Sequence, residues 1–172
     1  MSVKSTIEQA GKTMLGALTP GLEGSPDILD TLQTEHDDVQ DLLQRLTESD
    51  NARDQKSLVA QIKKALVPHT KAEEKVVYDA VLALKGKEAK IEGMEGYIEH
   101  GLADQTLKKL DKLTANTPEF KATAKVLKEL IEHHVKEEES DIWAQVKENF
   151  SQPQRERMNR DFLAAKKKVK VS

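Results

Sequence analysis

Cysteine is absent from this 172-residue sequence, and aromatic residues make up only 3% of it. Without thiols there can be no disulfide, thiolate metal site, iron–sulfur cluster or cysteine nucleophile, so any bound metal must have nitrogen and oxygen ligands. An excess of basic charge is missing too, because 27 Lys and Arg face 30 Asp and Glu for a net charge of -3. Such a chain has no overall positive field, and we expect no nucleic-acid partner.

Long hydrophobic runs are also lacking. No window approaches the ~18 consecutive apolar residues of a membrane span, and the N-terminus lacks the apolar core and small-residue cleavage site of a secretory signal. We therefore expect a cytoplasmic protein without a membrane partner. The few aromatic side chains offer few interface anchors, which favours a monomer.

Strand signals are nearly absent, whereas good helix formers fill the stretches between the five prolines and eight glycines. Apolar residues recur every three or four positions in these stretches, which predicts amphipathic helices. The predicted helices cover about 27–49, 54–84, a shorter stretch after Gly96, 118–149, and a short fifth helix that starts at Ser151.

Four main helices with mostly short connections predict an all-α protein, an up-down-up-down four-helix bundle. We expect the bundle over residues 26–150, a short N-terminal arm at 1–25, and a short C-terminal fifth helix with a basic tail at 151–172. The arm contains an amphipathic stretch that either packs on the bundle, frays, or contacts a membrane or partner.

Local signals refine this prediction. Thr117-Pro118 has the form of a helix start, with Thr as N-cap and Pro in the first turn. Pro68 predicts a kink in the second helix. The three glycines between Lys85 and Gly96 predict a loop. The helical period places Val76, Ala80 and Leu84 on the core face of the second helix.

Histidines mark one position on each main helix. Four of the five stand at 36, 69, 100 and 134, at intervals of 33, 31 and 34. In an up-down bundle, one helix plus one loop of about that length returns the chain to the same height, so the four imidazoles can converge in one layer. Each of the four shares its helix face with apolar residues, whereas His133 occupies a boundary position.

Two glutamates complete the pattern. Glu73 and Glu138 each follow a histidine by four residues, so the same His-x-x-x-Glu motif occurs on two helices. Residues at i and i+4 share a helix face, so both carboxylates point into the histidine layer. Burying them costs several kcal/mol each unless a cation compensates their charge. The sequence predicts a site for two metal ions, iron with manganese or zinc left open, with the ligands His36, His69, Glu73, His100, His134 and Glu138.

Other residues near this pattern keep two interpretations. Asp104 and Glu139 either orient a ligand or lie on a solvated face. Tyr78 and Trp143 are predicted to cap the core. The alternative to a metal site is a metal-free helical scaffold, in which core histidines are merely hydrogen-bonded and the glutamate pairs are solvated.

These motifs resemble the hemerythrin-like family, the bundles with an HHE cation-binding motif. The resemblance covers about residues 27–150 and rests on Glu35-His36, His69-Thr-Lys-Ala-Glu73-Glu74, Glu99-His100 and His134-Val-Lys-Glu-Glu138-Glu139. It implies a non-haem di-iron centre in which the four histidines are terminal ligands, Glu73 and Glu138 bridge the irons, and an oxo or hydroxo group adds a further bridge.

The chain departs from the oxygen-carrying members of that family. They place a second histidine one turn beyond the one on the third helix, where this chain has Asp104. It is more similar to four-histidine, two-glutamate relatives that handle nitric oxide or peroxide, sense iron, or repair iron sites. Ferritin-like proteins need Glu-x-x-His, which is absent from the sequence.

The resemblance implies a protein that binds or reduces a small oxidant, O2, NO or peroxide, in a stress response or in iron-site repair. The alternative function is a non-catalytic iron or oxygen sensor, or an iron-handling module, that acts through a protein partner.

Overall fold

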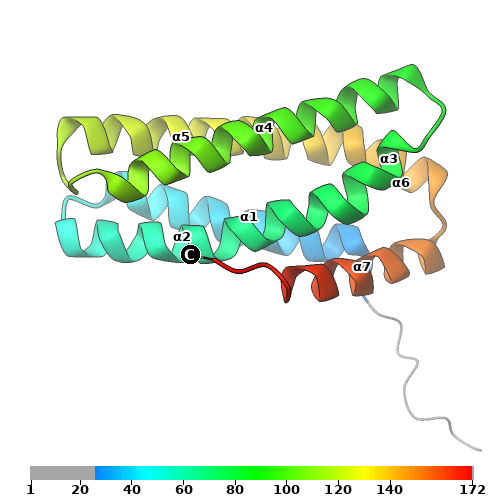
Figure 1. The fold of residues 1–172 in the computed structure, drawn as a ribbon, viewed down its shortest axis with the longest axis horizontal. Coiled ribbons are helices and arrows are strands. Elements are labelled where there is room, and N and C mark those ends of the chain that lie inside the picture. The colour runs from blue at the N-terminus through cyan, green and yellow to red at the C-terminus, as the bar shows by residue number, and fades with distance from the viewer. Residues whose placement is uncertain (1–25, 172) are drawn as a thin grey trace, which may run out of the picture.

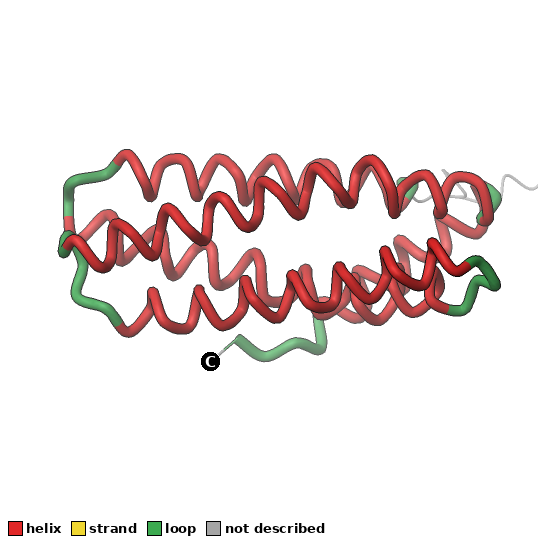
Figure 2. The backbone as a smooth tube through the Cα atoms, turned by 90° about the horizontal axis from the view of Figure 1, so that it is seen from above, coloured by secondary structure: helices red, strands yellow, loops and turns green. Residues whose placement is uncertain are grey.

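The computed structural model describes residues 26–171, and helices are the only regular elements of that part of the chain (Figure 2). The predicted arm at 1–25 lies outside the described residues. The elements are α1 (Ile28–Glu48), α2 (Ala52–Glu73), η1 (Glu74–Tyr78), α3 (Asp79–Leu82), α4 (Lys87–Lys112), α5 (Pro118–Glu137), η2 (Glu138–Ile142), α6 (Trp143–Asn149) and α7 (Gln152–Lys166), where η1 and η2 are single π-helical turns.

Four long helical segments lie side by side and form the bundle (Figure 1). They are α1, α2 continued through η1 to α3, α4, and α5 continued through η2 to α6. The prediction of an all-α four-helix bundle is confirmed. The up-down-up-down order stays a prediction, and the turns at alternate ends of the bundle agree with it (Figure 1). In the described part, no helix has both the length and the apolar character needed to cross a membrane.

The predicted helix starts are confirmed by their caps. The Asp27 carboxylate accepts a hydrogen bond from the Leu29 backbone N–H at 3.1 Å. The Thr117 hydroxyl accepts a hydrogen bond from the Phe120 backbone N–H at 3.2 Å, and Pro118 lies in the first turn. A capping box at Ser151 opens α7. These side chains satisfy backbone donors that a helix start would otherwise leave unpaired.

The loop predicted between Lys85 and Gly96 is wrong, because α4 already begins at Lys87. Gly93 and Gly96 are buried in the helix, where they permit close packing against α3 and η1 rather than a turn. A Cβ atom at Gly96 would lie 2.6 Å from Cζ of Tyr78, and one at Gly93 would lie 3.0 Å from the Leu82 side chain. The two glycines, which usually weaken a helix, thus let α4 pack closely against its neighbours here.

Gly96→Ala should lower the free energy of unfolding by about 1–3 kcal/mol, because the added methyl group overpacks a fully buried ring. The intrinsic effect has the opposite sign, since alanine in a helix is favoured over glycine by ~1 kcal/mol. Gly101→Ala is the matched control, because a Cβ atom there meets nothing within 4 Å. Urea denaturation should show a loss for the first variant and a gain for the second; a gain for both would contradict the close contact.

The core face predicted for the end of the second helix is wrong by one position. Val76, Ala80 and Leu84 are only partly buried, while Val77 and Val81 are buried. The cause is η1, whose i→i+5 hydrogen bonding holds one more residue in the turn and so moves the buried face one residue along the chain. Pro68 does not end the helix, since α2 continues to Glu73.

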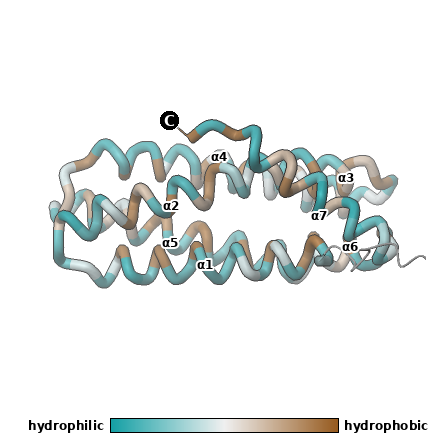
Figure 3. The backbone as a smooth tube through the Cα atoms, turned by 90° about the horizontal axis from the view of Figure 1, so that it is seen from below, coloured by the Kyte–Doolittle hydropathy of each residue, from teal (hydrophilic) through white to brown (hydrophobic). Residues whose placement is uncertain are grey.

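The core has two apolar clusters with the polar residues of the bundle interior between them. Hydrophobic and hydrophilic residues alternate along each helix, as Figure 3 shows. One cluster fills the end near the α1–α2 and α4–α5 turns and includes Leu43, Leu110 and Phe120. The other, which includes Tyr78 and Phe162, lies toward α3, α6 and α7. α7 packs against α1, α2 and η1 alongside this part of the bundle.

Candidate metal centre

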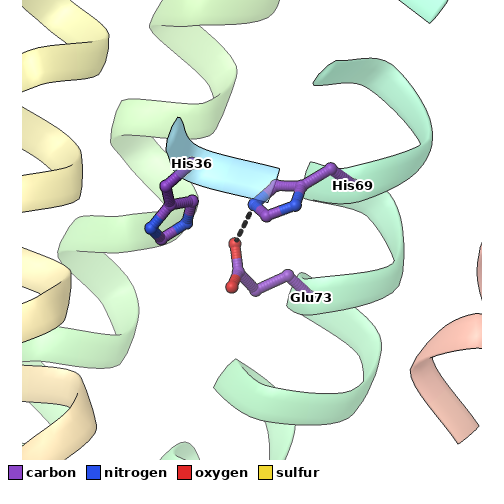
Figure 4. Close-up of side chains that lie close together, drawn as sticks. All are labelled: His36, His69 and Glu73. Carbon is purple, nitrogen blue, oxygen red and sulfur yellow. Dashed lines mark ion pairs between the residues drawn. The ribbon is translucent and has the colours of Figure 1, made fainter. Parts of the chain in front are cut away.

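The structure brings together all six residues predicted to bind metal. They lie between the two apolar clusters and none is more than 5% exposed. α1, α2, α4 and α5 each supply one histidine, and α2 and η2 supply the glutamates. Figure 4 shows His36 and His69 on either side of the Glu73 carboxylate.

Each glutamate is shared by two histidines. The Glu73 Oε2 atom lies 3.2 Å from His69 Nε2 and 3.5 Å from His100 Nε2. The Glu138 Oε2 atom lies 3.3 Å from His134 Nε2 and 3.6 Å from His36 Nε2. The two carboxylates therefore connect the histidines of the four helices across the bundle interior.

The histidines form two pairs. The rings of His36 and His69 have centroids 5.1 Å apart. His100 and His134 are 4.6 Å apart by the same measure, and their Nε2 atoms are separated by 3.1 Å. Each glutamate contacts one histidine of each pair, so two cations, each held by one pair, would have both carboxylates in common.

The buried polar atoms fit a bound cation. Both oxygens of Glu73, both oxygens of Glu138 and Nε2 of His36 have no well-formed hydrogen bond within residues 26–171. Buried polar groups are almost always satisfied, because an unpaired one costs about 1–3 kcal/mol and an ionised one costs more. Imidazole and carboxylate donors suit iron, manganese and zinc. The six residues can therefore hold divalent cations.

Each of the four site histidines also contacts a second carboxylate, through its Nδ1 atom. We call these four second carboxylates the outer carboxylates. A partner on this side fixes the ring so that Nε2 points inward. The Nδ1 distances are 3.0 Å from His36 to Glu139, 2.9 Å from His69 to Glu35, 3.4 Å from His100 to Glu74 and 2.7 Å from His134 to Glu99.

These contacts decide between the two interpretations left open for Glu139 and Asp104. Glu139 orients His36, whereas Asp104 pairs with Lys108 at 2.6 Å and does not contact the site. Three further partners were not predicted: Glu35 and Glu99, which hydrogen-bond to His69 and His134, and Glu74, which contacts His100 without a well-formed hydrogen bond. Each is next to a site residue in the sequence, which was the available signal.

The comparisons with known proteins agree with this geometry. A family model described as the hemerythrin HHE cation binding domain matches residues 27–146. This chain belongs to the hemerythrin HHE family. The resemblance inferred from the motifs is therefore confirmed.

One curated relative of this HHE domain is a DNA nickase from Nostoc sp. (strain PCC 7120 / SAG 25.82 / UTEX 2576). The two are 30% identical over 168 residues, which is 97% of this chain and 47% of the nickase. The chain thus spans about half the length of that relative. No solved structure matches it significantly.

The HHE site has an approximate two-fold repeat. The site histidines, the shared glutamates and the outer carboxylates of one half recur at equivalent places in the other half. A π turn follows directly after Glu73 in one half and begins at Glu138 in the other. Trp143 stacks on His36 with ring centroids 6.0 Å apart, and Tyr78 packs against His100 at 5.1 Å. Both aromatic residues are buried, as predicted for core caps.

The C-terminal helix α7 covers one half of this repeat. Phe162 packs edge-on against His69, with ring centroids 5.8 Å apart. Lys166 Nζ lies 2.5 Å from Glu35 Oε1, and Glu35 in turn contacts His69. This role of α7 was not predicted from the sequence, where the basic tail has no visible connection to the histidines.

The metal-free HHE site retains protons. Burial opposes ionisation of His134, yet its contacts with the Glu138 and Glu99 carboxylates raise its pKa to about 10. Burial and the neighbouring Glu138 carboxylate raise the pKa of Glu73 well above its ordinary value. Burial lowers the pKa of His100 to about 4 and also lowers that of His36. Metal binding must therefore displace the proton that His134 holds.

These shifts predict how the stability of the metal-free protein depends on pH. From about pH 4 to 6.5, the unfolded chain holds protons that native His100 and His36 have lost, so stability should rise with pH. From pH 6.5 toward 10, native His134 keeps a proton that the unfolded chain has lost, so stability should fall. Denaturation of chelator-treated protein should show a maximum near pH 6.5. A continuous rise to pH 9 would contradict the protonated site.

Removal of an outer carboxylate should weaken metal binding without removing a ligand. Glu139→Ala frees the His36 ring, and loss of such a partner typically costs 10–100-fold in affinity. The exposed Glu148→Ala variant removes the same charge elsewhere and should bind as wild type. Competition against a chelator of known affinity measures the metal affinity of both variants. Equal affinities would mean that Glu139 does not orient His36.

Proposed function

We propose that this HHE domain is a non-haem di-iron protein that binds or reduces a small oxidant, O2, NO or peroxide. The observation that carries the proposal is the sharing of Glu73 and Glu138 between the two histidine pairs. When bound, two ferrous ions would supply the two electrons that, with two protons, convert a peroxide into two waters. The six protein ligands leave coordination positions for an exogenous molecule.

A small cavity beside the site supports the proposed ligand class. It has a volume of about 10 Å³, enough for roughly one water-sized molecule. Its walls are formed by three site histidines, by the apolar side chains of Val39, Leu66, Ile131 and Val135, and by the polar residues Glu35 and Thr70. Such a cavity suits a small uncharged molecule next to His36 and His69, and it excludes larger organic substrates.

Anaerobic loading with ferrous iron, followed by separate additions of O2, NO and peroxide, tests this function. We expect a new visible or near-ultraviolet absorption with at least one of them. A variant with His69→Ala and Glu138→Ala, incubated with iron in the same way, should give none. A fully iron-loaded wild type without an optical change with any of the three would reject the proposal.

The sensor function remains the alternative, and the surface of α4 favours it. Ile91, Met94, Ile98 and Leu102 are exposed and follow one another at helical spacing, so they form an apolar stripe along α4. His100, a site residue, lies on the same helix and could transmit the state of the metal to a partner on that stripe. Capture of one specific partner by the iron-loaded form and not by the metal-free form would favour the sensor.

DNA nicking is suggested by the name of the Nostoc relative alone. The net charge of -3 offers no general attraction for a phosphate backbone. Incubation of iron-loaded protein with supercoiled plasmid, with a radical scavenger present, tests this directly. Nicking that is lost in the His69→Ala and Glu138→Ala variant would establish it.

A further inference from the structure

A second cluster of metal-binding side chains lies at the surface beside the proposed centre. This outer cluster consists of Glu99, His133 and Glu137, whose ligand atoms lie within 4.8 Å of one another. His133 Nε2 is 3.3 Å from Glu137 Oε1 and 3.7 Å from Glu99 Oε1. The His133 side chain is 60% exposed, so the cluster is open to solvent.

Glu99 connects the outer cluster to the buried site. Its Oε1 atom faces His133, while its Oε2 atom lies 2.7 Å from Nδ1 of His134. One carboxylate thus touches both a surface histidine and a buried one.

A small acidic pocket continues inward from this point. It has a volume of about 20 Å³, lies between α4 and α5–η2, and reaches His134 and Glu138 of the buried site. Among the described residues that line it there is no Lys or Arg. Its carboxylates belong to Glu92, Glu95, Glu99, Glu137, Glu138 and Asp141.

Unpaired buried groups line the inner end of the acidic pocket. The Tyr78 hydroxyl belongs to a fully buried side chain, and no well-formed hydrogen bond for it exists within residues 26–171. Both Glu138 oxygens are in the same condition, and so is Oε2 of Glu92, another residue that lines the pocket. Burial and the nearby Asp141 carboxylate raise the pKa of Glu92, as expected where negative charge is concentrated. A passing cation would satisfy these oxygens.

The other half of the pseudo-two-fold repeat lacks most of these features, although it keeps Glu35 and Glu73 at the positions that correspond to Glu99 and Glu138. The correspondence between α1 and α4 follows from pairing His36 with His100. Pairing His69 with His134 relates α2 to α5 in the same way. The equivalent positions of the first half are mostly apolar, and α7 packs over that side. The residues that correspond to Glu92, Glu95, His133, Glu137 and Asp141 are Ile28, Thr31, Pro68, Ala72 and Val76.

The scaffold alone therefore does not require the carboxylates of the acidic pocket. We propose that the outer cluster and the acidic pocket form the path by which a divalent cation enters the buried site. The inference rests on the proposed function, because it needs a metal centre at the end of the path. The outer cluster captures the hydrated cation with one imidazole and two carboxylates. The pocket then passes it between carboxylates to Glu138, and the negative field raises its local concentration.

The rate of metal uptake tests the path. Metal-free protein is mixed with ferrous iron under argon, uptake is stopped at set times with a ferrous chelator, and retained iron is counted. His133→Gln with Glu137→Gln, and separately Glu95→Gln with Asp141→Asn, should slow uptake by about 10-fold or more, in the range of electrostatic focusing by charged clefts. Retained iron at the end point should equal that of wild type.

The matched control removes two carboxylates from the exposed face of the same helix α5. Glu129→Gln with Glu132→Gln, which lie outside the acidic pocket, should load at the wild-type rate. Higher salt should reduce the difference between wild type and the pocket variants, because salt screens exposed charges.

Three other results of the uptake experiment would overturn the path, and each has a different meaning. Wild-type rates in both sets of variants would overturn the path while leaving the metal centre intact. A lower end point in the variants would assign these residues to holding the metal, which also overturns the path. A wild type that retains no iron would reject the proposed function and the path with it.

Discussion

A variant with Glu73→Leu and Glu138→Leu should lose both metal ions together. Each carboxylate contacts one histidine of each pair, so neither half of the site keeps an anionic ligand once both are removed. The loss in affinity should exceed the 10–100-fold typical of an outer partner. Metal analysis after loading and desalting measures it.

The same variant should not be less stable than the metal-free wild type. Replacing buried charged groups by apolar side chains of similar volume is often neutral or stabilising by about 1–4 kcal/mol. Both glutamates are almost completely buried, so the exchange removes their desolvation cost. Exposed Glu129→Leu with Glu132→Leu is the control and should keep both metals. A double variant that retains full metal, or that is clearly less stable than the metal-free wild type, would contradict the assigned role of the two carboxylates.

Removal of the metal from the wild-type protein should lower its melting temperature by about 10 °C or more. A ligand at 1,000 times its dissociation constant stabilises the native state by ~4 kcal/mol. For a protein of this size, 1 kcal/mol shifts Tm by about 2–4 °C. Metal also neutralises the carboxylates that are otherwise buried without hydrogen bonds.

Calorimetry of chelator-treated and iron-loaded protein at one pH measures this shift. Restoration of the original Tm by added ferrous iron would show that the treatment itself caused no damage. Equal melting temperatures in the two forms would mean that the six residues do not bind metal in the native state.

The main helices and the convergence of the six candidate ligands could be predicted from the sequence, because both depend on local periodicity. Histidines near every 33rd position and glutamates four residues after two of them specify a face and a height on each helix. The caps at Asp27 and Thr117 were equally predictable, since a capping side chain acts within two or three residues of itself.

The remaining features depend on contacts between distant segments. From the sequence alone, Gly93 and Gly96 predict a loop. Only the structure shows that the Leu82 and Tyr78 side chains pack where a Cβ atom of these glycines would lie. A π turn has no simple period, so the shift of the buried face to Val77 could not be foreseen. The support of His69 by α7 likewise joins segments that are far apart in the sequence.

The measurement that tests the central claim most directly is the number and coupling of iron ions per chain. Protein loaded anaerobically with ferrous iron and desalted is analysed by elemental analysis and Mössbauer spectroscopy. We expect about two irons per chain, magnetically coupled after oxidation because both ions share Glu73 and Glu138. One iron per chain, no iron, or two magnetically independent irons would contradict a shared site.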